Sequence, residues 1–355
     1  MNAESTYPRA FESYGLEEIA LLVDGLGFPK FRTKQLVQWV YSHGVCSYDE
    51  MSNLPAKMRE VLKNQAPLHI PSIADRQISK DGSRKYILQL SDGKQVESVG
   101  IPSFDTDSEG KPRRLTVCFS TQVGCPMQCA FCATGQEGLS RNLLPGEMAQ
   151  QILCVQRDFG MKVTNVVAMG QGEPFLNYGN FIKALHIINN PEAMNIGARH
   201  ITVSSCGIID GINRFGKEPE QFTLAISLHA AQQDVRDFLM PRCQNMPLEQ
   251  LKQSLQTYYS LLKRRVSFEY LMIKGINDRK EDLDALISYC KGLHVHINLI
   301  PLNKVDGSKW IPSQPKTIKF WLDYLGKAGI EASLRNSRGS DIDGACGQLK
   351  NKKNR

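Results

Sequence analysis

Residues 114–135 read RLTVCFSTQVGCPMQCAFCATG. The stretch opens with the alternation of apolar and polar residues that is typical of a β-strand, and it continues into Cys125, Cys129 and Cys132 at C-x3-C-x2-C spacing. A structural zinc ion needs four ligands, and no fourth Cys or His follows at finger-like spacing. Three thiolates suit a four-iron cubane instead, because one iron then stays open to chelate the amine and carboxylate of a small ligand.

Strand-like runs alternate with amphipathic helices from residue 145 to residue 335. Helical periodicity covers 146–160, 178–190, 212–216, 248–264, 280–293 and 317–329, and strand-like runs cover 163–170, 198–205, 222–229, 265–273, 294–302 and 331–337. Six or seven βα units in series predict an α/β fold with a parallel sheet, either an open doubly wound sheet or a partial or complete (βα) barrel. We favour the barrel, because polar residues recur just after the strands.

Short polar motifs follow the strands at equivalent positions. They are Gly170-Gln171-Gly172-Glu173, Ser204-Ser205, Ser227-Leu228-His229 and Asn303. Gly, Ser and Asn are common in turns, so any one motif by itself is ordinary loop chemistry. Ligands bind α/β proteins at the carboxyl ends of the parallel strands, so the recurrence predicts one ligand site that all the motifs touch.

The chain upstream of the cysteines predicts two smaller units. Residues 15–64 contain amphipathic helices punctuated by Gly and Pro. Residues 70–122 change to a period of two, with turn signals at Lys80-Asp81-Gly82 and Ser91-Asp92-Gly93 that favour short antiparallel strands. We therefore expect a helical accessory domain over 1–68, a β-rich connecting segment over 69–114, the barrel core with a C-terminal cysteine loop over 115–349, and a basic tail over 350–355.

Composition indicates a soluble chain in a reducing compartment. The 355 residues are 41% apolar and 22% charged, which excludes disorder as the main state. No run approaches the roughly 18 apolar residues of a membrane-spanning helix, and the first residues lack the pattern of a secretory signal. We expect a cytoplasmic protein with reduced thiols and no membrane contact. Five of the ten cysteines lack special spacing and are assigned to packing: Cys46, Cys154, Cys206, Cys243 and Cys290.

The net charge of +7 is concentrated near the C-terminus. Residues 309–355 carry ten Lys or Arg against four Asp or Glu, which accounts for +6 of it. A phosphate-bearing partner is compatible with this excess, although a solvated helix surface and tail would look the same. The basic turn at 28–39 also has two interpretations, contact with a nucleic acid backbone or a helical core built from Phe31, Leu36 and Trp39, and we favour the core.

Several motifs resemble a known family. The spaced cysteines together with Gly172-Glu173 resemble the radical S-adenosylmethionine (SAM) superfamily, in which the three thiolates would hold a [4Fe-4S] cluster whose open iron binds the methionyl end of SAM. The chain from about residue 15 to residue 349 resembles the RlmN-type dual-specificity RNA methyltransferases, whose relative Cfr methylates another carbon of the same adenosine. The blocks that carry this resemblance are CFSTQVGCPMQCAFCATG (118–135), QVESVGIP (95–102), MGQGEPFLN (169–177), ISLHA (226–230), NLIPLN (298–303) and RGSDIDGACGQL (338–349).

The resemblance implies a route that uses two further thiols. Carbon 2 of adenine is electron-poor and has no lone pair with which to displace a methyl group from a sulfonium, so direct polar transfer is closed. In the family's chemistry Cys346 would take a methyl group from one SAM, and a 5′-deoxyadenosyl radical made from a second SAM would remove a hydrogen atom from it. The carbon radical would add to the ring, and Cys118 would attack the Cys346 sulfur, which leaves a disulfide for a reductant to reset. Glu97 matches the family's proton acceptor.

The resemblance also implies SAM ligands and partners. The residues expected at SAM are Gly172 and Glu173 at its amino group, Ser204, His229 and Asn303 at its ribose or carboxylate, and Ser227 and Leu228 through their backbone. The expected substrates are adenosines in 23S rRNA and, next to the anticodon, in tRNA, and the resemblance implies that the helical domain over 1–68 binds the RNA. We expect a flavodoxin or ferredoxin as electron donor, and a monomer.

Two positions depart from the family's pattern. Gln171 stands where Met is usual, and Cys206 stands where Thr or Val is usual. Neither is a cluster ligand or one of the two catalytic thiols, so carbon 2 methylation stays the expected reaction. Carbon 8 methylation of the ribosomal adenosine and a non-catalytic iron-sulfur RNA-binding protein remain the alternatives.

Overall fold

The structure, a computed structural model, describes residues 9–303 and 308–349. Its main feature is a ten-stranded sheet with the order β1-β2-β3-β4-β7-β8-β9-β10-β11-β12. A separate two-stranded sheet is formed by β5 (Gln122–Gly124) and β6 (Leu139–Asn142). The expected basic tail at 350–355 lies outside the described residues. None of the helices in the described ranges is both long enough and apolar enough to span a membrane.

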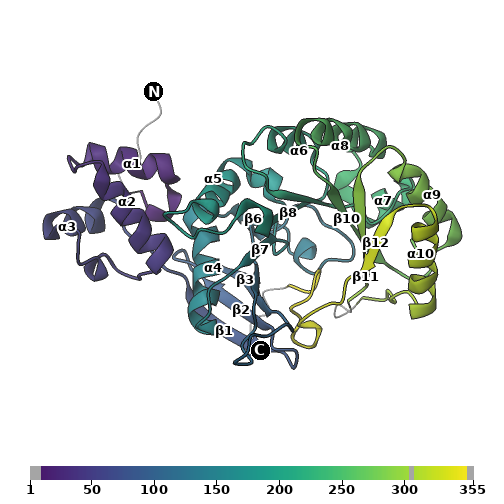
Figure 1. Cartoon of the computed structure of the whole chain (residues 1–355), viewed down its shortest axis with the longest axis horizontal. Helices are drawn as coiled ribbons and strands as arrows, with labels where there is room; N and C mark the ends of the chain where they lie inside the picture. Colours follow the sequence, from purple (N-terminus) through teal and green to yellow (C-terminus); the bar gives the residue numbers. More distant parts are fainter. Residues whose placement is uncertain (1–8, 304–307, 350–355) are drawn as a thin grey trace.

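Seven neighbouring strands of the main sheet run parallel: β4 (Leu115–Cys118), β7 (Asn165–Ala168), β8 (Ile201–Ser205), β9 (Thr223–Ser227), β10 (Val266–Met272), β11 (Val295–Pro301) and β12 (Glu331–Leu334). Figure 1 shows the sheet curving, with helices along its outer side. These are α4 (Pro145–Phe159), α5 (Tyr178–Asn189), α6 (Ile209–Phe215), α8 (Leu248–Leu262), α9 (Lys280–Cys290) and α10 (Pro315–Lys327). The shorter helix α7 (Gln233–Leu239) follows β9. Within the described chain β12 does not pair back to β4, so the predicted α/β barrel is confirmed in its partial form.

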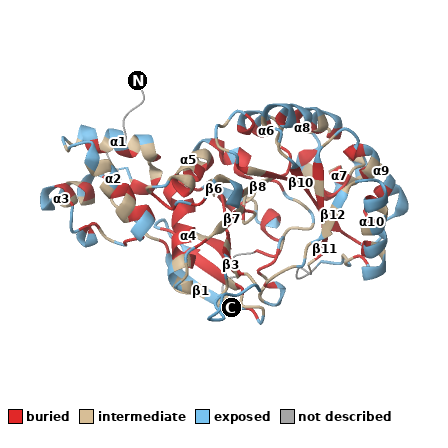
Figure 2. Ribbon diagram, viewed as in Figure 1, coloured by how far each residue is buried: buried red, intermediate tan, exposed pale blue. Residues whose placement is uncertain are grey.

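The core lies between the parallel strands and the helices, and buried residues alternate with partly exposed ones along β8 and most of β11. Val166, Val203, Phe268 and Ile297 on four of the strands have no exposed surface. The helices bury one apolar side against the sheet, as Trp321 of α10 does, and keep the other side in solvent (Figure 2). Each such side chain stabilises the fold by about 1.5–3 kcal/mol.

The same sheet is extended by three antiparallel strands: β1 (Ser72–Ile78), β2 (Arg84–Gln89) and β3 (Gln95–Pro102). The two predicted turns connect them, and Gly82 and Gly93 have φ values of 83° and 78°, which favour glycine. β3 pairs directly with β4, where Val99 lies opposite Cys118. The predicted antiparallel strands are therefore continuous with the sheet of the barrel.

The N-terminal helices pack beside α4 and α5 and share one hydrophobic core with the barrel (Figure 1). They are η1 (Phe11–Ser13), α1 (Leu16–Gly25), α2 (Phe31–Val37), the π-helical turn η2 (Gln38–His43) and α3 (Ala56–Gln65). Leu36 is fully buried and Trp39 packs against the core, as expected. The core assignment of Phe31 was wrong: it begins α2, is 58% exposed, and its ring instead lies 4.7 Å from the Arg32 guanidinium.

Two elements near the site were not predicted. The first is the β5–β6 hairpin, whose connection at residues 125–138 contains the three spaced cysteines. The second is α7, a seven-residue helix after β9. Both are shorter than the window over which hydrophobic periodicity can be recognised.

Candidate active site

A cavity opens at the carboxyl ends of the parallel strands, the edge at which the polar motifs were expected to meet. Part of its lining comes from the last residues of β8 and β9 and from residues that follow β7, β9 and β11: Gly170, Gly172, Glu173, Ser204, Ser227, His229 and Asn303. The three spaced cysteines and Cys346 line the same cavity. Residues in or directly after six strands, β7 to β12, therefore converge on one site with the two cysteine-bearing loops.

The cysteine loop, residues 125–138, is held between β5 and β6. Gly124 has a φ of 79°, and a Cβ at this position would collide with the carbonyl of Gly138. The Cys125 N–H donates to that same carbonyl at 2.9 Å. The close approach of the two backbones fixes the ends of the loop, and the three thiols then face the cavity.

Burial raises the pKa of all three loop thiols, to about 12 for Cys125. The neighbouring sulfurs raise it further, because their negative charges would lie close together. The charge of Arg236 opposes the rise at Cys129 but does not cancel it, so the thiols stay protonated at neutral pH. The donor set therefore suits a cationic metal group, which would hold the sulfurs as thiolates.

The spread of the three sulfurs disfavours a single zinc ion. Thiolates at about 2.3 Å from one zinc lie within about 4 Å of one another. Among the described residues, only His186, Glu218 and Glu220 bring three candidate donor atoms within 4.8 Å of one another, so the loop sulfurs are more widely spaced. Wider spacing fits a cubane, whose ligands bind separate irons.

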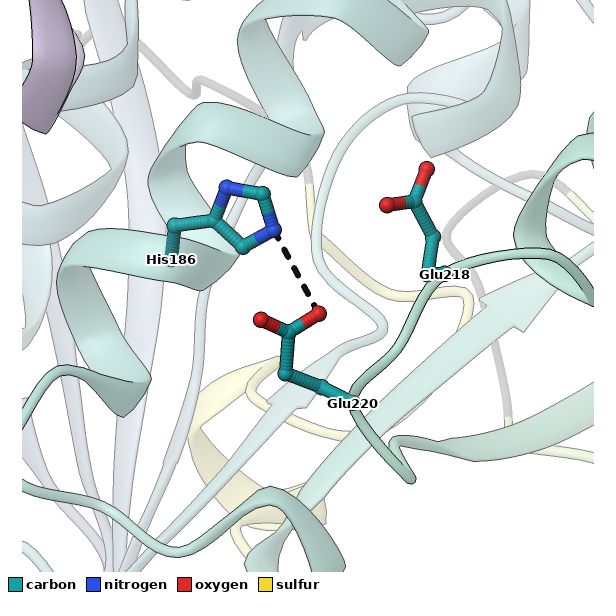
Figure 3. Close-up of side chains that lie close together, drawn as sticks. All are labelled: His186, Glu218 and Glu220. Atoms are coloured by element: carbon teal, nitrogen blue, oxygen red, sulfur yellow. Dashed lines mark ion pairs between the residues drawn. The ribbon is translucent and has the colours of Figure 1, made fainter.

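The group of His186, Glu218 and Glu220 lies on α5 and on the loop that leads into β9 (Figure 3), and none of its members lines the cavity. His186 Nε2 lies 3.5 Å from the Glu220 carboxylate, and the Tyr178 hydroxyl donates to Glu218 at 2.7 Å. Both carboxylates have partners within the protein, and all three side chains are partly exposed. The group has the character of an ordinary surface ion pair.

Glu173 places a fixed carboxylate in the cavity. Its two oxygens accept hydrogen bonds from the N–H groups of Phe175 at 3.0 Å and Cys206 at 2.7 Å. Burial raises the pKa of this carboxyl group, and the two bonds oppose that shift. Gly172 has a φ of 106°, and a Cβ there would come within 2.7 Å of the Gln122 side chain, so glycine is required beside it. A carboxylate held in this way suits an ammonium group.

Hydrogen-bonding side chains line another part of the cavity. The Ser204 and Ser227 hydroxyls lie 3.5 Å apart. Burial, with the charge of Arg236, lowers the pKa of His229 to about 3, so the ring is neutral. Its Nδ1 accepts from the Leu271 N–H at 3.1 Å, which leaves the proton on Nε2 as a donor.

Leu228 is fully buried and does not line the cavity. Its N–H donates to the Glu269 carbonyl at 3.1 Å, and the His229 N–H donates to the same oxygen at 3.2 Å. These two bonds tie the end of β9 to β10. Leu228 thus lies behind the cavity lining rather than in it.

A second cavity is lined by both Cys118 and Cys346. Arg335 lines both cavities. Burial raises the pKa of the Cys118 thiol to about 12; the nearby Cys346 adds to this shift, and the charge of Arg335 opposes it. Asn303 Nδ2 donates to the Cys346 carbonyl at 3.1 Å. Cys346 therefore stands between Cys118 and the cysteine loop.

Glu97 lies apart from both cavities. It is fully buried on β3, and its carboxylate lies 3.6 Å from the ammonium of Lys85, which is itself buried. Its N–H donates to the Gln171 side chain at 3.3 Å, and its carbonyl accepts from the Ser120 hydroxyl at 2.6 Å. Of the residues expected at the site, Glu97 and Leu228 are the two that line neither cavity.

Comparison with known proteins finds matches to the N-terminal helices and to the barrel. A model of the Radical SAM superfamily matches residues 119–287, and one of the "Ribosomal RNA large subunit methyltransferase N-terminal domain" matches residues 14–68. Two relatives, each described as "Probable dual-specificity RNA methyltransferase RlmN", come from Petrotoga mobilis (43% identical, covering 93% of this chain and 92% of the relative) and Clostridium novyi (40%, covering 95% and 96%). The chain belongs to the RlmN family.

The RlmN assignment agrees with a solved structure. A radical SAM methyltransferase from Sphaerobacter thermophilus is 37% identical, covers 97% of this chain and 99% of its own, and superimposes with a TM-score of 0.89. The expected family and the expected α/β fold are thereby confirmed. The RlmN-type chain is a SAM-dependent RNA methyltransferase, and its superfamily implies a [4Fe-4S] cluster, SAM and a reductant.

Sequence reasoning missed residues that line the cavities of this RlmN-type enzyme. Arg335 was counted only as surface charge, although its place directly after a strand was the signal that identified Asn303. Cys206 was assigned to packing, but it lines the first cavity. Cys46 was assigned to packing too, and it is exposed. Which thiols face a cavity depends on the folded chain and leaves no local spacing to read.

Proposed function

We propose that this enzyme methylates carbon 2 of an adenosine in 23S rRNA and of the adenosine next to the anticodon in tRNA. The observation that carries the proposal is the position of Cys346, which lines the cavity of the cysteine loop and also the cavity of Cys118. The Cys346 thiol can then receive a methyl group in the cavity of the cysteine loop and meet the Cys118 thiol in the second cavity.

The proposed cofactor site uses the groups that already line the first cavity. Cys125, Cys129 and Cys132 would hold the cluster, which supplies the electron that cleaves the sulfonium of SAM. Glu173, beside Gly172, would accept from the SAM ammonium, because its carboxylate is fixed by two backbone N–H groups. Ser204, Ser227, neutral His229 and Asn303 would hold its ribose and carboxylate, and Leu228 would support them from behind.

The proposed reaction uses two SAM molecules per turnover. The Cys346 thiolate would attack the methyl carbon of one SAM, the bond from that carbon to the sulfonium would break, and S-adenosylhomocysteine would leave, so that Cys346 becomes S-methylcysteine. After the activated methyl has bonded to the base, the adduct radical would lose one electron, which would return to the cluster, and the ring proton would leave. Cys118 would then attack the Cys346 sulfur, the electron pair of the bond from sulfur to the methylene carbon would go to the base, and a proton taken up there would complete the new methyl group. A Cys118–Cys346 disulfide would remain for an external reductant. We propose Glu97 as the acceptor of the ring proton. The family resemblance is the support for this role, since Glu97 lines neither cavity.

Anaerobic turnover tests the proposal. The reconstituted enzyme receives SAM, dithionite and either a 23S rRNA fragment or tRNA, and the digested RNA is analysed by mass spectrometry against standards. We expect 5′-deoxyadenosine and 2-methyladenosine with both RNAs. 8-Methyladenosine would replace the proposed target atom, and RNA binding without 5′-deoxyadenosine would favour the non-catalytic alternative. A monomer, a cytoplasmic location and a flavodoxin or ferredoxin donor stay predictions.

A further inference from the structure

The segment that carries Cys346 is anchored to the antiparallel part of the sheet as well as to the cysteine loop. After β12 the chain crosses the turn between β1 and β2, residues 79–83. Neither the residues of this turn nor the segment 335–349 falls within the two matched family models, which cover 14–68 and 119–287. The contacts between them therefore belong to a part of the chain that those models leave undescribed.

Arg338 and Asp81 form the centre of the anchor. The Arg338 guanidinium lies 3.0 Å from the Asp81 carboxylate and donates to the carbonyls of Asp81 at 2.7 Å and Pro102 at 3.1 Å. It also lies 3.8 Å from the centre of the Phe104 ring. The next residue, Gly339, donates its N–H to the Asp81 carboxylate at 2.9 Å. One guanidinium and one carboxylate thus join three segments of chain.

A second set of bonds runs beside the first. The Ser79 hydroxyl donates to the Asp341 carboxylate at 2.6 Å, and the Lys80 N–H donates to it at 3.2 Å. Although burial alone would raise the pKa of Asp81, hydrogen bonds from Ser83 and Gly339 lower it well below its usual range. Both carboxylates are consequently charged at neutral pH, and charge-assisted hydrogen bonds are the stronger kind.

The other side of the Cys346 loop is held by the cysteine loop and by β11. The Ala133 N–H donates to the Gly347 carbonyl at 2.8 Å, and the Thr134 hydroxyl donates to the Leu349 carbonyl at 2.6 Å. Asn303 holds the Cys346 carbonyl, as described above. Cys346 itself lies between Gly344 and Gly347 and is exposed, so its position depends on the two anchored flanks.

We propose that Ser79, Asp81, Arg338, Gly339 and Asp341 form a clamp that positions Cys346 between Cys118 and the cofactor cavity. This inference rests on the proposed function, because Cys346 needs a fixed position only if it carries the methyl group. Asp81 lines neither cavity, and Arg338 lines only the cavity that contains Cys118 and Cys346. Both are positioning residues, because the guanidinium of Arg338 binds Asp81 and two backbone carbonyls rather than either thiol. When the loop is held at both ends, the Cys346 sulfur stays within reach of SAM and of Cys118. This favours both the methyl transfer and the disulfide step over conformations in which the sulfur meets neither partner.

The first test measures the clamp without any turnover. Hydrogen exchange is followed in the cluster-loaded, full-length enzyme and in its Arg338→Gln variant. We expect the backbone amides of residues 339–344 to exchange at least about tenfold faster in the variant, the factor that corresponds to one lost charge-assisted hydrogen bond. Peptides of the cysteine loop should be unchanged. Equal exchange at 339–344 in the two proteins would overturn the clamp.

Arg113→Gln is the matched control. Arg113 lies in the connection between β3 and β4. Its guanidinium is 3.6 Å from the Asp105 carboxylate and donates to the Thr106 carbonyl at 2.8 Å, and neither partner belongs to the 335–349 segment. This variant should exchange like the wild type at 339–344. If Arg338→Gln fails to load its cluster, Asp81→Asn replaces it, since it removes the charge and keeps the size of the side chain.

The second test asks whether the clamp positions Cys346. Mass spectrometry gives the fraction of Cys346 that carries a methyl group after incubation with SAM and reductant. We expect this fraction to fall at least about threefold in Arg338→Gln, and Arg338→Lys to recover part of it, because Lys keeps the charge but cannot span both carbonyls. Faster exchange with unchanged methylation would overturn the positioning role. Wild-type protein that never methylates Cys346 would instead overturn the proposed function, while the exchange result would still stand.

Discussion

Cys118 is a buried thiol, and the proposed reaction needs its thiolate. Because burial raises the pKa of Cys118 to about 12, only a very small fraction is ionised near neutral pH. The thiolate fraction of such a group rises about tenfold for each unit of pH below the pKa. The charge of Arg335, which opposes the shift, is the feature of the second cavity that makes the attack feasible.

We therefore expect the release of product to be faster at higher pH. In a single-turnover experiment the covalent protein–RNA intermediate should decay about tenfold faster for each pH unit between about 7 and 9. Quenched samples on a denaturing gel measure the decay. A decay rate independent of pH across this range would mean that Cys118 attacks from an already ionised state, in conflict with its burial.

Replacing Cys118 removes the proposed resolving thiol. Cys118→Ala should therefore accumulate the protein–RNA crosslink by at least about tenfold over wild type, because the bond from the Cys346 sulfur to the methylene carbon has nothing to break it. The crosslink is quantified on a denaturing gel. Cys290→Ala, which removes a buried thiol of α9, is the control and should behave as wild type. Free RNA and normal turnover in Cys118→Ala would exclude Cys118 from the reaction.

Replacing Cys346 removes the proposed methyl carrier. Cys346→Ala should bind the cluster with unchanged iron content, since Cys346 is not one of the three spaced cysteines, and should yield no methylated adenosine. Iron analysis and mass spectrometry of digested RNA measure the two outcomes. Product at the wild-type rate would eliminate the carrier.

At this scale the sequence identifies residues whose spacing is local. The C-x3-C-x2-C run and the motifs after the strands needed no structure, because their spacing or their place at a strand end carries the signal. Arg335 and Cys206 carry the same signal, because they come directly after β12 and β8, but one was counted as surface charge and the other was assigned to packing. The burial of Glu97 beside Lys85 could not be predicted, because an alternating strand pattern does not show which face of a strand will be covered.

At the scale of elements, Gln151 joins α4 to two strands. Its side-chain oxygen accepts from the Ser98 hydroxyl at 2.8 Å and the Ser120 N–H at 2.9 Å, and its side-chain nitrogen donates to the Ser120 carbonyl at 3.0 Å. Gln151 is fully buried, so no water replaces these partners easily. Ser120 follows β4 and also bonds to Glu97 and Gln171, so one glutamine orders the chain that leads from Cys118 to the cysteine loop.

Gln151→Leu should destabilise the enzyme by about 3 kcal/mol or more, because it leaves several buried polar groups without a partner, each at a cost of about 1–3 kcal/mol. Denaturant unfolding of the full-length protein measures the change. Gln156→Leu on the same helix is the control: Gln156 accepts a single bond, from the Val163 N–H at 3.0 Å, so its loss should be about a third as large. Equal effects of the two substitutions would show that the Gln151 bonds contribute little.

Most elements could be predicted from their periodicity. The long helices α4, α5, α8, α9 and α10 and the strands β7 to β12 agree with the expected runs to within a few residues, because each presents a regular apolar face. The β5–β6 hairpin could not be predicted, since its strands have three and four residues and β6 is largely exposed. Its conformation follows from the close approach of Gly124 and Gly138, which no periodicity records.

At the scale of the whole molecule, Glu12 lies where the N-terminal helices meet the barrel. Its carboxylate accepts from the His69 N–H, and a Cβ at Gly146 of α4 would come within 2.6 Å of the Glu12 backbone. Burial raises the pKa of Glu12 from 4.5 to about 7, and nearby Glu147 contributes a further rise. The folded enzyme therefore favours the protonated carboxyl group more than the unfolded chain does.

This preference fixes the sign of a pH effect on stability. Between the unfolded pKa of 4.5 and the folded pKa of about 7, the folded state binds more protons, so the free energy of unfolding falls as pH rises. The loss approaches about 3 kcal/mol above pH 7. Glu12→Gln should remove it and be more stable than wild type at pH 8 but similar at pH 4.5, as denaturant unfolding at the two values measures. A stability difference that does not change with pH would contradict the raised pKa.

The continuity of β3 with β4 could not be predicted, because strand pairing between distant segments leaves no mark on local periodicity. It has a consequence for any shortened version of the enzyme. A chain that began at residue 115 would uncover one edge of β4 and present its free N–H and C=O groups to other molecules. Such fragments should self-associate, and solubility will therefore require the upstream strands even where only the cluster chemistry is wanted.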